Sequence, residues 1–180
     1  MEASNELIEE SVKESLKEDY LKSLEDWVCT SRISYKLLKA ASCFKENFNV
    51  LYRYVARPWD DYYKENNVWS LKEGDIFSAT PCSSSILQFL SKENYDSFVD
   101  KITVFTSQNS DADICEMVFH NAEGWKIPDS VYDITSQWSD SDYRWQQEVI
   151  LDGRYKVTKV IEINDKDRPT LKRRVELTSF

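Results

Sequence analysis

Side chains suited to oxyanion and carbocation chemistry occur in three short pieces of the sequence, in a fixed order. Arg53 lies in LYRYV, Ser78 and Thr80 lie in DIFSAT, and Gln146 and Glu148 open QQEVIL. A guanidinium presents a planar fork of N–H donors that suits phosphate oxygens better than a lysine does. A carboxylate stabilises developing positive charge, and neighbouring hydroxyls can fix its rotamer. These residue types together predict a site that binds an oxyanion and stabilises a cationic transition state.

Each of these residues also has an ordinary structural interpretation. A lone strand arginine such as Arg53 is often a surface salt-bridge partner, and Ser78 and Thr80 could cap the turn before the next helix. Glu148 could be an edge-strand carboxylate in water. Only their occurrence together, in this order, favours chemistry over these alternatives.

The motifs of several familiar enzyme classes are missing from the sequence. The three glycines, Gly74, Gly124 and Gly153, form neither a GxGxxG dinucleotide fingerprint nor a Walker loop. His120 is the only histidine and no serine has a nucleophile motif around it, which disfavours a Ser-His-Asp hydrolase. The four cysteines, at positions 29, 43, 82 and 115, include no CxxC pair, so we expect reduced, mostly buried thiols and no metal site.

Hydrophobic periodicity predicts the elements that position these residues. Apolar residues at three-to-five-residue steps from Leu7 to Val28 predict one helix, and a second is expected over residues 34–48. Beyond residue 50 the pattern changes to strands, and Asp152-Gly153 between two alternating runs predicts a β-hairpin over residues 146–163. The other strands are expected over residues 51–57, 75–80, 102–106, 114–120, 131–135 and 170–178.

Strand alternation places side chains on faces. Successive strand residues point to opposite sides, so we expect Gln146 and Glu148 to share one face while Val149 and Leu151 pack on the other. Without repeats or a linker, the chain is expected to be one α+β domain over residues 1–180. Its helical part would cover residues 1–48 and its β-rich core residues 50–180.

Composition limits the class of protein further. Of the 180 residues, 41% are hydrophobic and 13% aromatic, which is enough for a real core. The net charge of −9 argues against a protein that coats nucleic acid, and the basic run Lys172-Arg173-Arg174 is typical of a solvated strand. No apolar run is long enough for a membrane span, and the acidic N-terminus is no signal peptide. We therefore expect a cytoplasmic protein with no membrane partner.

The three pieces resemble the Arg–Ser–Glu group of ADP-ribosyltransferases. In that group they read as an aromatic-Arg strand, a Ser-[Thr/Ala/Ser]-[Ser/Thr] strand, and [Glu/Gln]-x-Glu followed by an apolar hairpin. The sequence is similar in particular to small phage-encoded transferases, which also have a helical segment before the arginine. The resemblance covers roughly residues 50–163. One departure is Tyr54, where relatives often have glycine; this residue could narrow the NAD cleft.

The resemblance implies a NAD-dependent mono-ADP-ribosyltransferase with two packed sheets around a NAD cleft. NAD would be a substrate, and no metal would be needed. Breaking its nicotinamide–ribose bond passes through an oxocarbenium-like species. Glu148 is implied to accept a hydrogen bond from the ribose 2′-hydroxyl and stabilise that species. Arg53 would hold the pyrophosphate or the neighbouring ribose, and Ser78 and Thr80 would orient Glu148.

The resemblance also bears on the acceptor of ADP-ribose. Relatives with two glutamates in the third piece usually modify arginine, whereas those with Gln-x-Glu modify asparagine or glutamine side chains or nucleobases. Gln146 therefore disfavours arginine and leaves protein amide and DNA or RNA base open. The segment 136–145 corresponds to the acceptor-presenting loop, in which Trp138, Tyr143 and Trp145 could stack on a base or pack on a protein.

The implied biological role is that of an intracellular toxin or effector, phage-related or part of a toxin–antitoxin pair. Its partners would be the macromolecular acceptor and, in such a pair, a neutralising antitoxin. Two other functions remain open at this stage. One is a NAD glycohydrolase, in which water replaces the acceptor. The other is a non-catalytic binding module that keeps the fold.

Overall fold

The computed structural model describes residues 2–56, 68–70, 76–83, 114–138, 144–169 and 171–179. The chain forms two compact units. The first comprises Met1–Lys45 and Ile127–Trp145, and the second comprises Glu46–Lys126 and Gln146–Phe180. The first boundary between the units, after Lys45, lies close to the predicted change from helical to β-rich sequence. A later helical segment, around residue 130, also belongs to the first unit.

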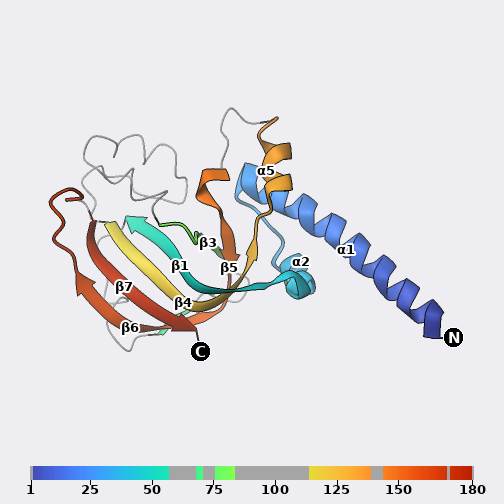
Figure 1. Cartoon of the computed structure of the whole chain (residues 1–180), viewed down its shortest axis with the longest axis horizontal. Coiled ribbons are helices and arrows are strands. Elements are labelled where there is room, and N and C mark those ends of the chain that lie inside the picture. Colours follow the sequence, from blue (N-terminus) through green and yellow to red (C-terminus); the bar gives the residue numbers. More distant parts are fainter. Residues whose placement is uncertain are drawn as a thin grey trace. The chain divides into compact units, whose positions relative to one another are not determined.

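The first unit is built from helices, shown in Figure 1. The predicted first helix is confirmed, and Tyr20 and Leu24 on it are buried. Tyr20 stacks on Phe44 with ring centroids 5.1 Å apart. Ser34 caps the second helix by accepting a hydrogen bond from the Leu37 backbone N–H. The helical elements are α1 (Glu2–Thr30), α2 (Tyr35–Ala40), η1 (Ala41–Phe44), α5 (Asp129–Thr135) and η3 (Arg144–Gln146), which ends at the first residue of the second unit.

Two predictions for this region are wrong. The second helix is expected from the sequence to reach residue 48, but its helical turns end at Phe44 and a strand begins at Glu46. The run from Val131 to Thr135, predicted as a strand, is helix α5. Short apolar runs do not distinguish the two structures by periodicity. Here Pro128 and Asp129 precede the run as helix-start residues, and this local signal outweighs its β-branched composition.

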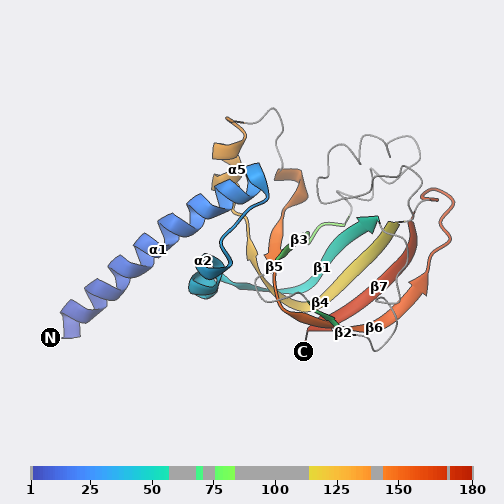
Figure 2. The same cartoon turned by 180° about the vertical axis from the view of Figure 1, so that it is seen from behind.

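The second unit is one mixed sheet in which β4 is central. Its strand order is β2-β6-β7-β4-β5-β3, and β1 pairs with β4. The β4–β7 pair is parallel and the other pairs are antiparallel. Figures 1 and 2 show β1, β4 and β7 lying side by side and curving together. The strands are β1 (Glu46–Ala56), β2 (Val68–Ser70), β3 (Phe77–Ala79), β4 (Ile114–Lys126), β5 (Val149–Leu151), β6 (Arg154–Glu162) and β7 (Leu171–Ser179).

The predicted β-hairpin is wrong in its pairing. Asp152 and Gly153 do connect β5 to β6, and Gly153 has φ of 105°, as a turn glycine should. However, β5 pairs with β3 and β4, whereas β6 pairs with β2 and β7. Every residue of β5 is buried, so this short strand is covered on both faces, whereas β6 begins with alternating exposed and buried residues. The chain therefore changes partners at the turn.

One edge of β4 is shared by two strands. β7 pairs with residues 114–120 and β5 with residues 124–126, because β1 occupies the other edge. A Cβ at Gly124 would lie 2.6 Å from a Val149 methyl carbon and 2.8 Å from the Ile150 carbonyl oxygen. Only glycine allows this approach. At the far end of the sheet, Thr80 just past β3 bridges back to Tyr52 of β1.

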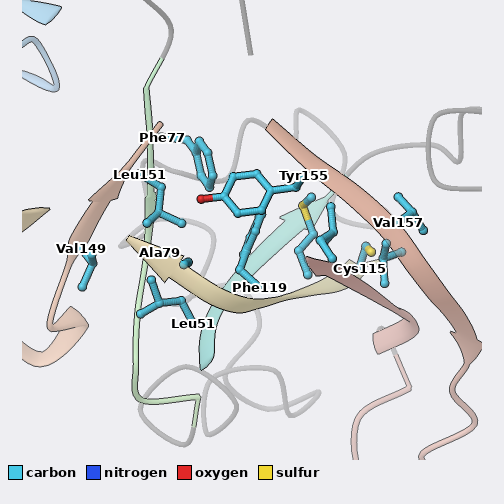
Figure 3. Packing of buried hydrophobic residues seen from close by; sticks show 13 residues of the cluster. Leu51, Phe77, Ala79, Cys115, Phe119, Val149, Leu151, Tyr155 and Val157 are labelled. Carbon is cyan, nitrogen blue, oxygen red and sulfur yellow. The ribbon is translucent and has the colours of Figure 1, made fainter. Parts of the chain in front are cut away.

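This topology confirms an α+β fold with a mixed β core. The described strands are joined in one continuous sheet that bridges back to itself, rather than in two separate sheets. Among the described residues, thirteen buried ones form its core, shown as sticks in Figure 3. Phe119 lies 5.2 Å from Phe77 and 4.9 Å from Tyr155 between ring centroids, the latter edge to face, a favoured aromatic geometry.

Candidate functional site

Strand β1 positions Arg53. Its backbone pairs with Met117 of β4, and the alternation of β1 turns its side chain to the same side as the core residue Leu51. The half-buried guanidinium donates from Nη1 to the backbone oxygen of Ser78 at 2.6 Å. Its central carbon lies 5.4 Å from the centroid of the Phe77 ring. Two contacts with β3 therefore hold this cation in place, one of them a cation–π contact.

Strand β3 carries the two hydroxyl residues. Phe77 and Ala79 belong to the core, so alternation turns Ser78 and Thr80 to the opposite face. Both are nearly inaccessible, with exposures of 7% and 3%. The backbone of Thr80 exchanges two hydrogen bonds of 2.8 Å with Tyr52, which ties the end of β3 to the middle of β1.

The hydroxyl of Thr80 also has a local structural role. It accepts a hydrogen bond from the backbone N–H of Cys82 at 3.1 Å. The turn-capping interpretation is therefore confirmed for this residue. The two interpretations are compatible, because a hydroxyl that accepts one bond still has a proton to donate.

Glu148 directly precedes β5 and is half-buried. In the β3–β5 register, Ala79 lies opposite Val149 and Ser78 opposite Ile150. Thr80 directly follows the last residue of β3, and Glu148 directly precedes the first residue of β5. The pairing of β3 with β5 therefore places the hydroxyl piece beside the strand that Glu148 precedes.

The predicted strand face shared by Gln146 and Glu148 is wrong. Gln146 ends the 3-10 helix η3, and the strand begins only at Val149. Between the two, Gln147 has φ of 43°, in the left-handed region that is costly for a residue with a Cβ. Strand alternation therefore does not apply to this pair. A sharp change of chain direction separates Gln146 from Glu148.

The loop aromatics differ in environment. Trp138 follows α5 and is 81% exposed, the larger of the two exposed apolar side chains among the described residues. Trp145 lies in η3 and is half-buried. Tyr143 lies outside the described residues. Trp138 therefore fits the predicted surface role, and Trp145 fits the alternative of an aromatic that anchors its loop.

The structure brings together three polar residues whose contacts the sequence did not predict. Tyr54, Glu116 and Arg174 are direct register partners on β1, β4 and β7. The Tyr54 hydroxyl donates to Glu116 Oε2 at 2.5 Å, and Arg174 Nε donates to Glu116 Oε1 at 2.5 Å. Burial raises the pKa of Tyr54 well above its usual range, and the Glu116 carboxylate adds to the shift. The sequence signal for this cluster is Glu116 itself, because a glutamate inside the apolar run ICEMVFH needs buried partners.

This arrangement also explains the basic run of β7. Arg174 pairs with Glu116, and Arg173 pairs with Glu162 at 2.7 Å. Lys172 beside them is exposed. Two of the three cations are thus neutralised by acidic residues of neighbouring strands, which supports the structural interpretation of the run over a nucleic-acid role.

The four cysteines form no disulfide bond within the described residues. Cys115 is buried, but Cys29 and Cys43 are exposed, so the prediction of mostly buried thiols is wrong for these two. Within the described ranges, no group of three or more His, Cys, Asp or Glu residues is placed to hold a metal. In the same ranges, no helix has the length and apolar character of a membrane span.

The sequence matches no protein-family model and no curated protein. Among solved structures, it is similar to the type III effector XopAI of Xanthomonas axonopodis pv. citri, with 11% identity and a TM-score of 0.42 over 76% of this chain and 43% of the effector. It is similar to an ADP-ribosyltransferase of Clostridium botulinum, with 15% identity and a TM-score of 0.42 over 81% of this chain and 67% of that one. It is also similar to the C3larvin toxin of Paenibacillus larvae, an ADP-ribosyltransferase, with 13% identity and a TM-score of 0.40 over 96% of this chain and 93% of the toxin. The chain spans less than half the length of the effector.

Proposed function

We propose that this chain is a NAD-dependent mono-ADP-ribosyltransferase that acts on a macromolecular acceptor. The observation that supports it best is that three pieces far apart in sequence lie on adjoining strands of one sheet. Arg53 of β1 donates to the backbone oxygen of Ser78 at 2.6 Å, and β3 pairs with β5, the strand that Glu148 directly precedes.

In the proposed reaction, Arg53 holds the pyrophosphate of NAD. Its contacts with Ser78 and Phe77 orient the guanidinium plane before substrate binds, so little entropy is lost on binding. The bond between ribose C1′ and the nicotinamide nitrogen then breaks, and nicotinamide leaves with the electron pair. The acceptor nitrogen bonds to C1′ and releases a proton to solvent.

Glu148 stabilises the positive charge that develops on the ribose during this step. Its partial burial lowers the local dielectric and strengthens that interaction. Thr80 accepts from Cys82 and has its hydroxyl proton left to donate, and Ser78 lies on the same face of the sheet. Both hydroxyls would fix the rotamer of the carboxylate, which is a positioning role.

The proposed acceptor is a protein asparagine or glutamine side chain or a nucleobase, rather than arginine. A neutral amide at Gln146 offers both a donor and an acceptor but no charge to meet a guanidinium. Its place in η3, outside the strand that follows Glu148, separates its task from that of the glutamate. The biological role proposed with this activity is that of a toxin or effector, with an antitoxin as the partner that would neutralise it.

The test is incubation of the purified chain with labelled NAD and a cell extract, followed by digestion with protease or nuclease. We expect label on a macromolecule, removed by one of the two digestions only, and no labelling of free arginine. Glu148→Gln is the matched control, because it keeps the size of the side chain and should abolish most of the labelling. Release of free ADP-ribose alone would favour the glycohydrolase, and no consumption of NAD would favour a binding module.

A further inference from the structure

The polar row Tyr54–Glu116–Arg174 crosses three adjacent strands. Each oxygen of the Glu116 carboxylate accepts one short bond, from Tyr54 on one side and from Arg174 on the other. Tyr54 and Glu116 are each 1% exposed, while the Arg174 side chain is 43% exposed. The row therefore joins β1 and β7 to β4 through a buried carboxylate with a partner on each oxygen.

This row lies beside Arg53. Tyr54 follows Arg53 in β1, so the two side chains point to opposite faces of the strand. The sequence suggests that Tyr54 could narrow the NAD cleft, but its ring is turned to Glu116, away from Arg53. On β1, Tyr52 is held by Thr80, Arg53 by Ser78 and Tyr54 by Glu116. Two of these consecutive residues are thus tied to β3 and its end, and the third to β4.

We propose that Tyr54 is a positioning residue for Arg53, acting through β1; this inference rests on the proposed function. A strand held by backbone bonds alone can change its local twist, and a small change at Tyr54 would move the neighbouring guanidinium. The bond from the Tyr54 hydroxyl to the buried Glu116 carboxylate is directional, so it fixes the strand more tightly than apolar packing would. The geometry assigns to the row the task of setting the direction in which Arg53 meets its anion.

The experiment compares Tyr54→Phe with Tyr155→Phe in the full chain. Each variant removes one phenolic hydroxyl from a buried ring, and the Tyr155 hydroxyl donates to the Asp152 backbone oxygen at 3.2 Å from β6, a strand that does not pair with β1. We expect Tyr54→Phe to weaken NAD binding by about five- to tenfold and to change kcat by less than about twofold. Tyr155→Phe should lower the melting temperature but leave NAD binding within about twofold of wild type. Unchanged NAD binding in Tyr54→Phe would overturn the inference.

A second readout needs no NAD. The Nε–H resonance of Arg53, assigned with Arg53→Lys, should shift and exchange faster with solvent in Tyr54→Phe and stay in place in Tyr155→Phe. Identical Arg53 resonances in wild type and Tyr54→Phe would contradict the positioning role. Failure of the wild type to bind NAD would instead contradict the proposed function, and the resonance alone would then decide this inference.

A third variant covers the case in which Tyr54→Phe does not fold. Arg174→Lys keeps the positive charge at the end of the row but removes the Nε contact with Glu116. Arg174→Lys should shift the Arg53 resonance in the same direction as Tyr54→Phe does, but by a smaller amount. No shift in a folded Arg174→Lys would contradict the proposal.

Discussion

The two faces of the β1–β4 pair are both buried, but different forces hold them. On one face, Leu51, Met117 and Phe119 pack in the apolar core. On the other, Tyr54 and Glu116 meet through a short hydrogen bond. Apolar packing is strong but non-directional, whereas a bond to a buried carboxylate is directional and costly to break. We therefore expect the apolar face to supply most of the stability of the sheet and the polar face to set its geometry at Arg53.

The largest expected effect is on the apolar face. Phe119→Ala should lower the free energy of unfolding by about 3–5 kcal/mol, because it removes a fully buried ring that contacts Phe77 and Tyr155. Denaturant unfolding of the two proteins measures the difference. A loss below about 1 kcal/mol would mean that this cluster is not the main source of stability.

A smaller effect is expected when one residue of the polar row is removed. Glu116→Ala leaves the Tyr54 hydroxyl buried without its acceptor, which costs about 1–3 kcal/mol. Arg174 is half-exposed and can hydrogen-bond to water instead, so the loss of its contact with Glu116 adds less to the destabilisation. The same denaturant titration measures this loss, and a loss as large as that of Phe119→Ala would contradict the ranking of the two faces.

The whole row offers a sharper version of the same measurement. The triple variant Tyr54→Phe, Glu116→Leu and Arg174→Met should be more stable than Glu116→Ala, since replacing hydrogen-bonded partners together by apolar side chains can be nearly neutral. It should nevertheless bind NAD more weakly than wild type. A stable triple variant with unchanged NAD affinity would contradict the proposal that the polar face sets the geometry at Arg53.

Alkaline pH probes both faces through groups that must stay protonated. Burial raises the pKa of the Cys115 thiol to about 12, and it raises the pKa of Tyr54 and Tyr155 above their usual range. In the unfolded chain a thiol ionises near pH 8.5 and a phenol near pH 10, approximately. Because the folded pKa values are the higher ones, their contribution to stability is complete below about pH 8.5 and is lost as pH rises towards 12.

The measurement is urea unfolding between pH 7 and 11. Stability should fall above about pH 9, at a slope of up to about 1.4 kcal/mol per pH unit for each ionising group. Tyr54→Phe should make the fall above about pH 10 shallower. A flat profile up to pH 11 would show that these groups are not buried in the folded state.

The smallest effect on stability is expected for Trp138, which is 81% exposed. Trp138→Ala should change the free energy of unfolding by less than about 0.5 kcal/mol. It should weaken the transfer of ADP-ribose to the acceptor while sparing NAD hydrolysis, because the ring is available to a partner. Equal loss of both activities would exclude an acceptor role.

Local signals predicted much of the fold. The apolar steps of α1, the strand character of residues 51–56 and 114–120, and the turn glycine Gly153 are encoded within a few neighbouring residues, and the sequence predicts them. The partner of each strand is not local. β5 and β6 flank a good turn, yet their partners are set by burial of the whole of β5 and by the close approach at Gly124.

The candidate site shows the same limit. Arg53, Ser78, Thr80 and Glu148 could be named from their types and order, and the structure shows a direct contact between Arg53 and the backbone of Ser78. The turn at Gln147 could not be predicted, because a residue with a Cβ at positive φ gives no sequence signal. The partners of Glu116 could not be predicted either, because they lie on strands distant in sequence and only the strand register places them opposite it.

The central claim is that Arg53 belongs to a NAD site, and calorimetric titration of NAD tests it most directly. Wild type should bind NAD, and Arg53→Ala should lose about 1.5–3 kcal/mol of binding free energy, since a charge-assisted contact with phosphate is removed. Lys172→Ala is the control, because it removes one exposed positive charge from β7 and should leave affinity unchanged. No binding by wild type at millimolar NAD, or equal affinity of wild type and Arg53→Ala, would contradict the account.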